Sequence, residues 1–228
     1  MSFVENLKHV SERIAGAAER AGRSASDITI VAVTKTFGPE TVEEAVRGGV
    51  LDVGENRIQE FLEKSERVSL DCRWHLVGHL QTNKVSKAVG RFALIQSVDS
   101  LKVAGKLSRV SGERGVTTDI LIEVNTSGES SKHGFDPDET VDAFGEIFRL
   151  PALSVHGLMT VGPWVEDETV VASAFGRLRR LKEEIERSAS EDFVLEHLSM
   201  GMSDDFELAV REGSTMVRLG RVLFGERG

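Results

Sequence analysis

Short apolar segments alternate with amphipathic helical segments about eight times along this chain of 228 residues. Strand followed by helix, repeated in this way, is typical of a parallel sheet whose strands are joined by crossover helices. The predicted strands are Ile28–Thr34, Val50–Val53, Arg73–Val77, Ala93–Val98, Thr118–Val124, Ser154–Met159, Phe193–Leu198 and Thr215–Leu219. The predicted helices between them lie near Pro39–Arg47, Arg57–Val68, Asn83–Val89, Ser100–Ser111, Pro137–Arg149, Asp167–Arg187 and Asp204–Arg211.

Eight such units in a chain of this length predict an α/β fold that closes into a (β/α)8 TIM barrel. An extra N-terminal helix precedes them, because apolar residues recur at helical spacing over Phe3–Ala18, with Ser2 as N-cap and Gly22 as the stop. The alternative is an open doubly wound sheet, which would favour a Gly-x-Gly-x-x-Gly turn after the first strand. The sequence there is TKTFGPE, so we expect one barrel domain over residues 1–228.

Composition and charge narrow the function classes. The formal net charge of −9 argues against a nucleic-acid-binding surface spread over the whole molecule. The single cysteine, Cys72, excludes an intramolecular disulfide framework and fits a reducing compartment. The first residues lack the apolar region of a signal peptide, and no stretch approaches about 18 uncharged apolar residues. We therefore expect a cytoplasmic protein that binds neither nucleic acid nor membrane.

Two predicted strands end in residues that suit a cofactor site, because barrels of this kind keep their chemistry at the carboxyl ends of strands. Lys35 follows the first strand, where a lysine can either reach solvent or act in a site. The last strand ends in RLGRVLFG, which has the layout of a barrel phosphate site with a short extra helix. The first and last strands of a closed barrel are neighbours. A lysine amine beside a phosphate-bearing aldehyde is the arrangement for a Schiff base with pyridoxal phosphate (PLP).

Other strand ends have purely structural interpretations. Asn56 in GENRIQE is a good helix N-cap with Gln59 at capping-box spacing, although a capping side chain can also face a ligand. His75 and His79 are four residues apart, but they lie on a predicted strand and turn, which disfavours a zinc site. Ser203 is a candidate N-cap, and the small residues around it also leave N–H groups available to an anion.

Six segments, in order along nearly the whole chain, resemble the YggS/PROSC family of pyridoxal phosphate homeostasis proteins. They are AVTKTF, GENRIQE, WHLVGHLQTNK, EVNTSGESSKHGF, GLMTVGP and LSMGMSDDFELAVREGSTMVRLGRVLFG. The resemblance implies a barrel similar to the N-terminal domain of alanine racemase and a PLP held by a lysine. It also implies a protein with no established reaction, which binds and buffers the cofactor and delivers it to apo-enzymes.

The resemblance implies specific roles for residues of this chain. Lys35 matches the Schiff-base lysine, and Arg218 matches an arginine near the pyridine nitrogen. Ser203 and the backbone around Gly220 and Arg221 would hold the phosphate. The implied cofactor-binding residues are Lys35, Asn56, His79, Met200, Ser203, Arg218, Gly220 and Arg221.

Two positions depart from the family pattern. Phe37 stands where many members have a second lysine, which leaves any role of that lysine in doubt here. Arg221 stands where threonine is frequent, which puts the local phosphate contacts in doubt. The loop Asn125–Phe135, which carries Lys132 and His133, could be a lid or a solvated connection.

The residues argue against strong amino-acid chemistry. An arginine only donates hydrogen bonds, so Arg218 would disfavour protonation of the pyridine ring and weaken it as an electron sink. Racemases of the similar fold use a lysine and a tyrosine, whereas this chain has no tyrosine, and no second domain of its own is expected to cover the barrel mouth. We expect a non-enzymatic binding protein, a monomer or weak homodimer with apo-PLP enzymes as recipients. The alternatives are a PLP-dependent racemase or related amino-acid enzyme and, less favoured, a Schiff-base aldolase acting on a sugar phosphate.

Overall fold

The computed structural model describes residues 2–189 and 193–225 of the chain. Eight strands form a closed barrel in the order β1 to β8, with every neighbouring pair parallel. The strands are β1 (Thr29–Val33), β2 (Asp52–Glu55), β3 (Arg73–Leu76), β4 (Leu94–Val98), β5 (Thr118–Glu123), β6 (Leu153–Met159), β7 (His197–Ser199) and β8 (Met216–Leu219). The predicted (β/α)8 barrel is confirmed.

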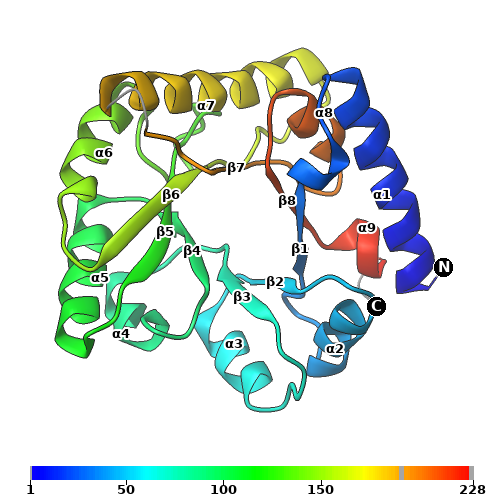
Figure 1. Ribbon diagram of the computed structural model, residues 1–228, viewed down its shortest axis with the longest axis horizontal. Coiled ribbons are helices and arrows are strands. Elements are labelled where there is room, and N and C mark those ends of the chain that lie inside the picture. Colours follow the sequence, from blue (N-terminus) through cyan, green and yellow to red (C-terminus); the bar gives the residue numbers. More distant parts are fainter. Residues whose placement is uncertain (1, 190–192, 226–228) are drawn as a thin grey trace.

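The helices form a ring outside the strands, and α1 lies beside α8 and α9 (Figure 1). The α-helices are α1 (Phe3–Arg20), α2 (Pro39–Arg47), α3 (Ile58–Ser65), α4 (Val85–Ala88), α5 (Leu101–Arg114), α6 (Thr140–Phe148), α7 (Glu168–Ala189), α8 (Phe206–Arg211) and α9 (Arg221–Phe224). The 3-10 turns are η1 (Ala25–Asp27), η2 (Thr82–Lys84) and η3 (Pro137–Glu139). Among the described residues, every helix is too short or too polar to cross a lipid bilayer.

The extra N-terminal helix begins and ends as its sequence predicts. The Ser2 hydroxyl accepts a hydrogen bond from the Glu5 N–H, and the Glu5 carboxylate accepts one from the Ser2 N–H, which completes a capping box. Helix α1 stops at Arg20, and Gly22 then adopts a positive φ of 67°. Its apolar side packs on α8, α9 and β8 in a cluster that includes Phe3, Val10, Ile14, Phe206, Val217 and Leu223.

Two strands and one helix lie in different places from those predicted. Strand β2 is Asp52–Glu55 rather than Val50–Val53, and β7 is His197–Ser199 rather than Phe193–Leu198. Helix α8 begins at Phe206 rather than at Asp204. The apolar runs misplace both strands because the barrel wall includes polar and small residues, while Phe193 packs on the aromatic rings of α6.

A chain of hydrogen bonds runs through the barrel interior beside a small apolar layer. The apolar layer consists of Val31, Leu94, Leu121, Met159 and Met216. The hydrogen-bonded chain, hereafter the axial chain, joins Arg218, Ser199, Gln96, His75, Asp52 and Arg73. Each of its six side chains forms at least one hydrogen bond to a neighbour in the chain, as buried polar side chains require. The axial chain therefore ties a residue of β8 to the opposite end of the barrel.

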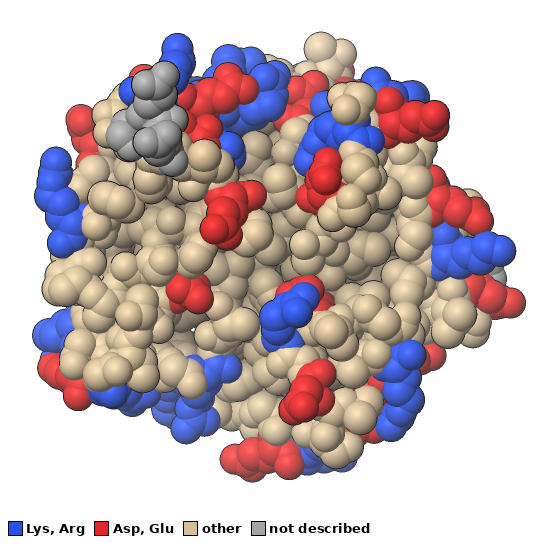
Figure 2. Space-filling model, in the orientation of Figure 1, with Lys and Arg blue, Asp and Glu red and all other residues tan. Residues whose placement is uncertain are grey.

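Acidic and basic side chains alternate around the rim of the face drawn in Figure 2, and residues of other kinds fill most of its centre. This interspersed arrangement differs from the continuous basic stripe typical of nucleic-acid-binding surfaces.

Candidate functional site

Lys35 lies directly after β1, at the carboxyl end of the barrel, and is half-buried. The next residue, Thr36, has a positive φ of 68°, which is costly for a β-branched residue. Its N–H donates a hydrogen bond of 2.8 Å to the Glu60 carboxylate, which holds this conformation. Backbone strain of this kind is concentrated at functional sites because the surrounding structure must enforce it. The chain therefore turns sharply at Lys35, and the turn is fixed from α3.

A buried ion pair supports the residue that precedes Lys35. The Lys64 ammonium group donates hydrogen bonds to the Thr34 carbonyl at 2.7 Å and to Glu55 Oε1 at 2.6 Å. The Thr34 hydroxyl donates to the same Glu55 oxygen at 2.6 Å. Burial raises the pKa of Glu55, and the hydrogen bonds from Lys64 and Thr34 act in the opposite direction. Sequence analysis missed this arrangement, because nothing in the helical pattern of α3 marks Lys64 as buried.

Arg218 is buried in the barrel interior near the same end. Its guanidinium donates hydrogen bonds to the Ser199 hydroxyl at 2.6 Å and to the Thr160 carbonyl at 2.7 Å. Burial lowers the pKa of Arg218 to about 10, and the negative charges of Glu123 and Asp205 partly oppose this effect. The side chain therefore remains a cation at neutral pH, with further N–H donors beyond the two already used.

Strand β8 passes through Gly220 into α9, which begins at Arg221, and Ser203 reaches this turn from the segment after β7. The Ser203 hydroxyl accepts a hydrogen bond of 3.3 Å from the Val222 N–H. Ser203 is not the N-cap of α8, since that position is Asp205, so the capping interpretation of Ser203 is wrong. A Cβ at Gly220 would lie 3.2 Å from the Val33 carbonyl oxygen, so this position favours glycine.

The Arg221 side chain points to a neighbouring acid and not to a backbone group. It is exposed and forms an ion pair with Asp204. The short helix that it begins, α9, is the extra helix expected after the last strand.

Asn56 and Met200 occupy different surroundings at this end of the barrel. Asn56 is half-buried directly after β2, and its backbone lies so close to Gly78 that a Cβ there would be 2.4 Å from its carbonyl oxygen. The N-cap of α3 is Arg57 without a side-chain cap, so the capping interpretation of Asn56 is wrong. Met200 is fully buried in the main hydrophobic cluster, and its N–H donates to the Met216 carbonyl.

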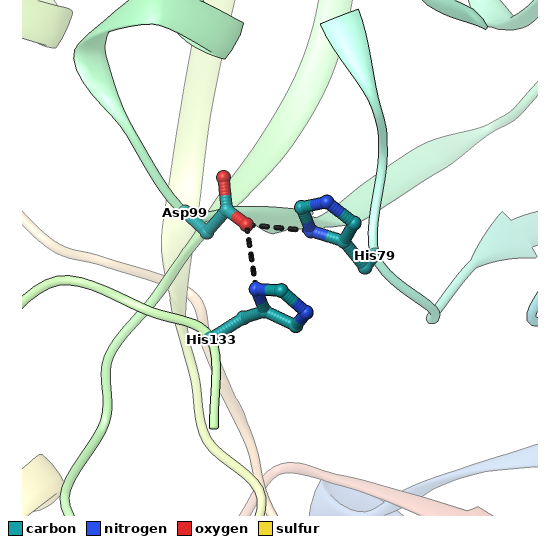
Figure 3. A group of neighbouring side chains, drawn as sticks. All are labelled: His79, Asp99 and His133. Carbon is teal, nitrogen blue, oxygen red and sulfur yellow. Dashed lines mark hydrogen bonds and ion pairs between the residues drawn. The ribbon is translucent and has the colours of Figure 1, made fainter. Parts of the chain in front are cut away.

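His79 lies on the β3 side of the mouth, in a cluster with Asp99 and His133 (Figure 3). Its Nδ1 is 2.7 Å from Asp99 Oδ2, and the Nδ1 of His133 is 3.7 Å from the same oxygen. The two imidazole rings stack with centroids 3.8 Å apart. His75, in contrast, belongs to the axial chain, so the structure separates the two histidines that are four apart in sequence.

Glu123 ends β5 between these two groups of residues. It is 7% exposed, and its Oε2 has no hydrogen-bond partner among the described residues. Burial, together with the negative charge of Asp99, raises the pKa of Glu123 to about 7, while Arg218 acts to lower it. Sequence analysis missed Asp99 and Glu123, because each is an acidic residue next to an apolar segment and belongs to no recognisable motif.

The loop Asn125–Phe135 folds back on itself. The Asn125 N–H donates to the Phe135 carbonyl, and the Phe135 N–H donates to the Glu123 carbonyl. The Lys132 ammonium group donates to the Gly162 carbonyl at 2.8 Å, which ties the loop to the segment after β6. The loop is therefore anchored at its base and at Lys132, and its tip is exposed.

The closed parallel barrel and the residues at the carboxyl ends of its strands can be compared with those of known protein families. The family described as alanine racemase, N-terminal domain, matches residues 6–228. The pyridoxal phosphate homeostasis protein of Aquifex aeolicus is 42% identical over 228 residues, which cover 100% of this chain and 99% of that protein. The protein of the same name from Homo sapiens is 38% identical, over 97% of this chain and 85% of the human protein. The chain belongs to the family of pyridoxal phosphate homeostasis proteins.

Solved structures agree with this assignment. PipY of Synechococcus elongatus with PLP bound is 33% identical, with a TM-score of 0.81 over 95% of this chain and 100% of that one. An alanine racemase of Clostridium difficile is 16% identical, with a TM-score of 0.76 over 98% of this chain and 57% of the racemase. At that identity the racemase shares the fold alone.

Proposed function

We propose that residues 1–228 act as one barrel domain that binds pyridoxal 5'-phosphate and buffers or delivers it in the cytoplasm, without a robust reaction of its own. The observation that carries the proposal is the position of Lys35. It follows β1, the strand that pairs with β8, and β8 carries buried Arg218. Strand β8 leads through Gly220 into α9, where the Val222 N–H donates to the Ser203 hydroxyl. The names of the sequence relatives and the PLP-bound PipY structure support the same function.

The residues present fit the cofactor. An anion would find the Ser203 hydroxyl and the backbone at Gly220 and Arg221 where β8 passes into α9. Arg218 would donate a hydrogen bond to the ring nitrogen from an N–H that Ser199 and Thr160 do not use. When bound, the cofactor supplies an aldehyde to which a primary amine adds reversibly. Lys35 would provide that amine, with Asn56, His79 and Met200 lining the pocket.

The same residues support a carrier over a racemase. Arg218 stays protonated, so it would disfavour a second positive charge on the ring nitrogen of a bound cofactor. A neutral ring withdraws electrons poorly, which weakens proton removal at an amino-acid α-carbon. The chain also has no tyrosine to serve as a second acid or base.

The first experiment is the visible absorption spectrum of the protein incubated with PLP, before and after borohydride reduction. We expect an absorption band that reduction abolishes and a pyridoxyl mass increment on the peptide that carries Lys35. Lys35→Ala should lose both signals, whereas Lys8→Ala, which removes an exposed lysine of α1, should keep them. A protein that takes up no PLP would refute the proposal and leave Lys35 as a solvated strand end.

A second experiment separates carrier from catalyst. The PLP-loaded protein is mixed with a PLP-dependent apo-enzyme while a trap removes free PLP, and recovery of the apo-enzyme's activity is measured. Activity that returns despite the trap supports direct delivery. Chiral analysis of amino acids incubated with the loaded protein tests the alternative, and sustained racemisation would overturn the carrier proposal.

A further inference from the structure

Three side chains from three separate segments meet at the β3–β5 side of the barrel mouth. His79 follows β3, Asp99 follows β4, and His133 lies in the loop after β5. One nitrogen of each histidine and one oxygen of Asp99 all lie within 4.8 Å of one another. Figure 3 shows both rings directing Nδ1 toward the same carboxylate oxygen. Two imidazoles and a carboxylate are a ligand set that first-row transition metals favour.

The surroundings of Asp99 add a second observation that indicates a cation. The Asp99 side chain is 8% exposed, and its charge acts directly on Glu123. Glu123 has a buried oxygen without a partner among the described residues. Two neighbouring carboxyl groups with little access to water repel each other when both are ionised. A divalent cation held by Asp99 would offset the negative charge that these two carboxyl groups bring to one buried place.

We propose that His79, Asp99 and His133 form a binding site for one divalent transition-metal ion, such as Zn²⁺ or Co²⁺. Three protein ligands leave at least one coordination position open to water or to another ligand. The site lies on the opposite side of the closed barrel from β8 and α9. It shares His79 with the pocket lining proposed above, so metal binding is tested without PLP. Because His133 belongs to the loop Asn125–Phe135, the ion would join that loop to the ends of β3 and β4.

Metal binding requires a defined movement of the rings. The imidazole planes are nearly parallel, at 10°, and an ion must lie close to the plane of each ring that binds it. The rings must therefore unstack. Their side chains are 36% and 56% exposed, so both have room to rotate about their χ angles. Each neutral imidazole would bind through Nδ1 with its single proton on Nε2, so a proton held at Nδ1 moves to Nε2 by exchange with solvent when the ion enters.

The test uses the full chain without a histidine tag, freed of metal by a chelator and without added PLP. Co²⁺ is added while the visible d–d absorption is recorded, and Zn²⁺ binding is measured by calorimetry. We expect one ion per chain, with Zn²⁺ displacing Co²⁺. His133→Ala should weaken binding more than about tenfold, because it removes a ligand. His9→Ala, which removes an exposed histidine of α1, should bind as the wild type does.

A second measurement does not depend on the folding of a variant. In the wild-type protein, Co²⁺ should shift and broaden the ring-proton NMR signals of His79 and His133 while leaving those of His9 in place. Equal affinity of the wild type and His133→Ala, or ring signals of His79 and His133 that do not respond to Co²⁺, would overturn the proposal. Asp99→Asn provides a further variant, and it should weaken binding while retaining a side chain of similar shape.

Discussion

The two sides of the barrel mouth are built from opposite kinds of groups. The β8 and β1 side presents the basic side chains of Lys35 and Arg218. It also presents the Ser203 hydroxyl beside the backbone amides at the start of α9. The β3–β5 side presents two carboxyl groups and two imidazoles. The first arrangement suits an anion, and the second suits a cation. Glu123 couples them, because its charge interacts with both Asp99 and Arg218.

The two sides also differ in how they are held in place. On the first side, Lys64 of α3 donates a buried hydrogen bond to the carbonyl of Thr34, which precedes Lys35. Arg218 donates to the Ser199 hydroxyl of β7 and to the Thr160 carbonyl directly after β6. On the second side, His79 and His133 are partly exposed, and both direct Nδ1 toward the Asp99 carboxylate. Substitutions can test this difference between an anion site held by buried hydrogen bonds and a more exposed cation site across the mouth.

The largest expected effect comes from breaking the buried support of the Lys35 side. Lys64→Met would leave the Glu55 carboxyl group fully buried without its cation and leave the Thr34 carbonyl without this donor. Removing one partner of a buried pair costs about 3–5 kcal/mol of stability. Urea unfolding monitored by circular dichroism should show this loss, and PLP affinity should fall with it because Lys35 follows Thr34 directly.

Two controls separate the pair from a general effect of losing a lysine or arginine. The double variant Lys64→Met/Glu55→Gln should recover much of the lost stability, since no buried charge remains unpaired. Arg47→Met removes an exposed partner of Glu43 and should cost less than about 1 kcal/mol. Equal losses for Lys64→Met and Arg47→Met would contradict the role assigned to Lys64.

The placement of Lys35 and Arg218 at neighbouring strands can be predicted from the sequence for a physical reason. Lys35 and Arg218 each end an apolar β-branched run, and in a closed barrel the first and last strands must be neighbours. The turn at Gly220 is signalled by a glycine beside a short apolar segment. Local pattern and closure together are sufficient to bring these residues near one another.

The other side could not be predicted in the same way. His79, Asp99 and His133 come from three loops, and only the path of each loop decides whether their side chains meet. The spacing in sequence would suggest a pair of His79 with His75, but the His75 side chain bonds to Asp52 within the axial chain.

The errors in strand position have a related cause. Strand β2 includes buried Asp52 and Glu55, whose polarity hides the strand because their partners are distant in sequence.

A pH dependence tests the far end of the axial chain that reaches Arg218. Burial opposes ionisation of Asp52, but hydrogen bonds from His75 and Arg73 outweigh it and lower the pKa of Asp52 to about 2. A carboxyl group with a lowered pKa contributes stability above its unfolded value, near 3.8, and the contribution is lost as pH falls toward 2. We expect about 1–2 kcal/mol at neutral pH, because solvent around exposed Arg73 screens part of the interaction.

Urea unfolding of the wild type and Asp52→Asn from pH 7 to pH 3 measures this contribution. The difference between the two proteins should be largest at pH 7 and should shrink below about pH 4. A difference that stays constant over this range would show that the charge of Asp52 is not the source.

Relief of the strained turn should separate stability from function on the Lys35 side. Thr36→Gly removes the penalty of a positive φ and should raise stability by up to about 1 kcal/mol, after allowance for the greater freedom of glycine when unfolded. The looser turn should nevertheless bind PLP more weakly. Ala152→Gly is the matched control, because Ala152 also has a positive φ, of 59°, but lies in the turn directly before β6. It should leave PLP affinity unchanged, and a parallel loss in both variants would argue against a special role for the turn at Lys35.

The smallest effects should distinguish the two side chains beside α9. Ser203→Ala removes the hydroxyl at the Val222 N–H and should weaken PLP binding several-fold, as expected for a hydrogen bond of about 1 kcal/mol. Arg221→Thr removes the guanidinium group and breaks only an exposed ion pair with Asp204. Such pairs contribute about 0–1 kcal/mol, so PLP affinity should change less than about twofold. If Arg221→Thr instead weakened binding more than Ser203→Ala, the arginine side chain would have to leave Asp204 for the phosphate. The anion site would then be less fully preformed than its neighbouring hydrogen bonds indicate.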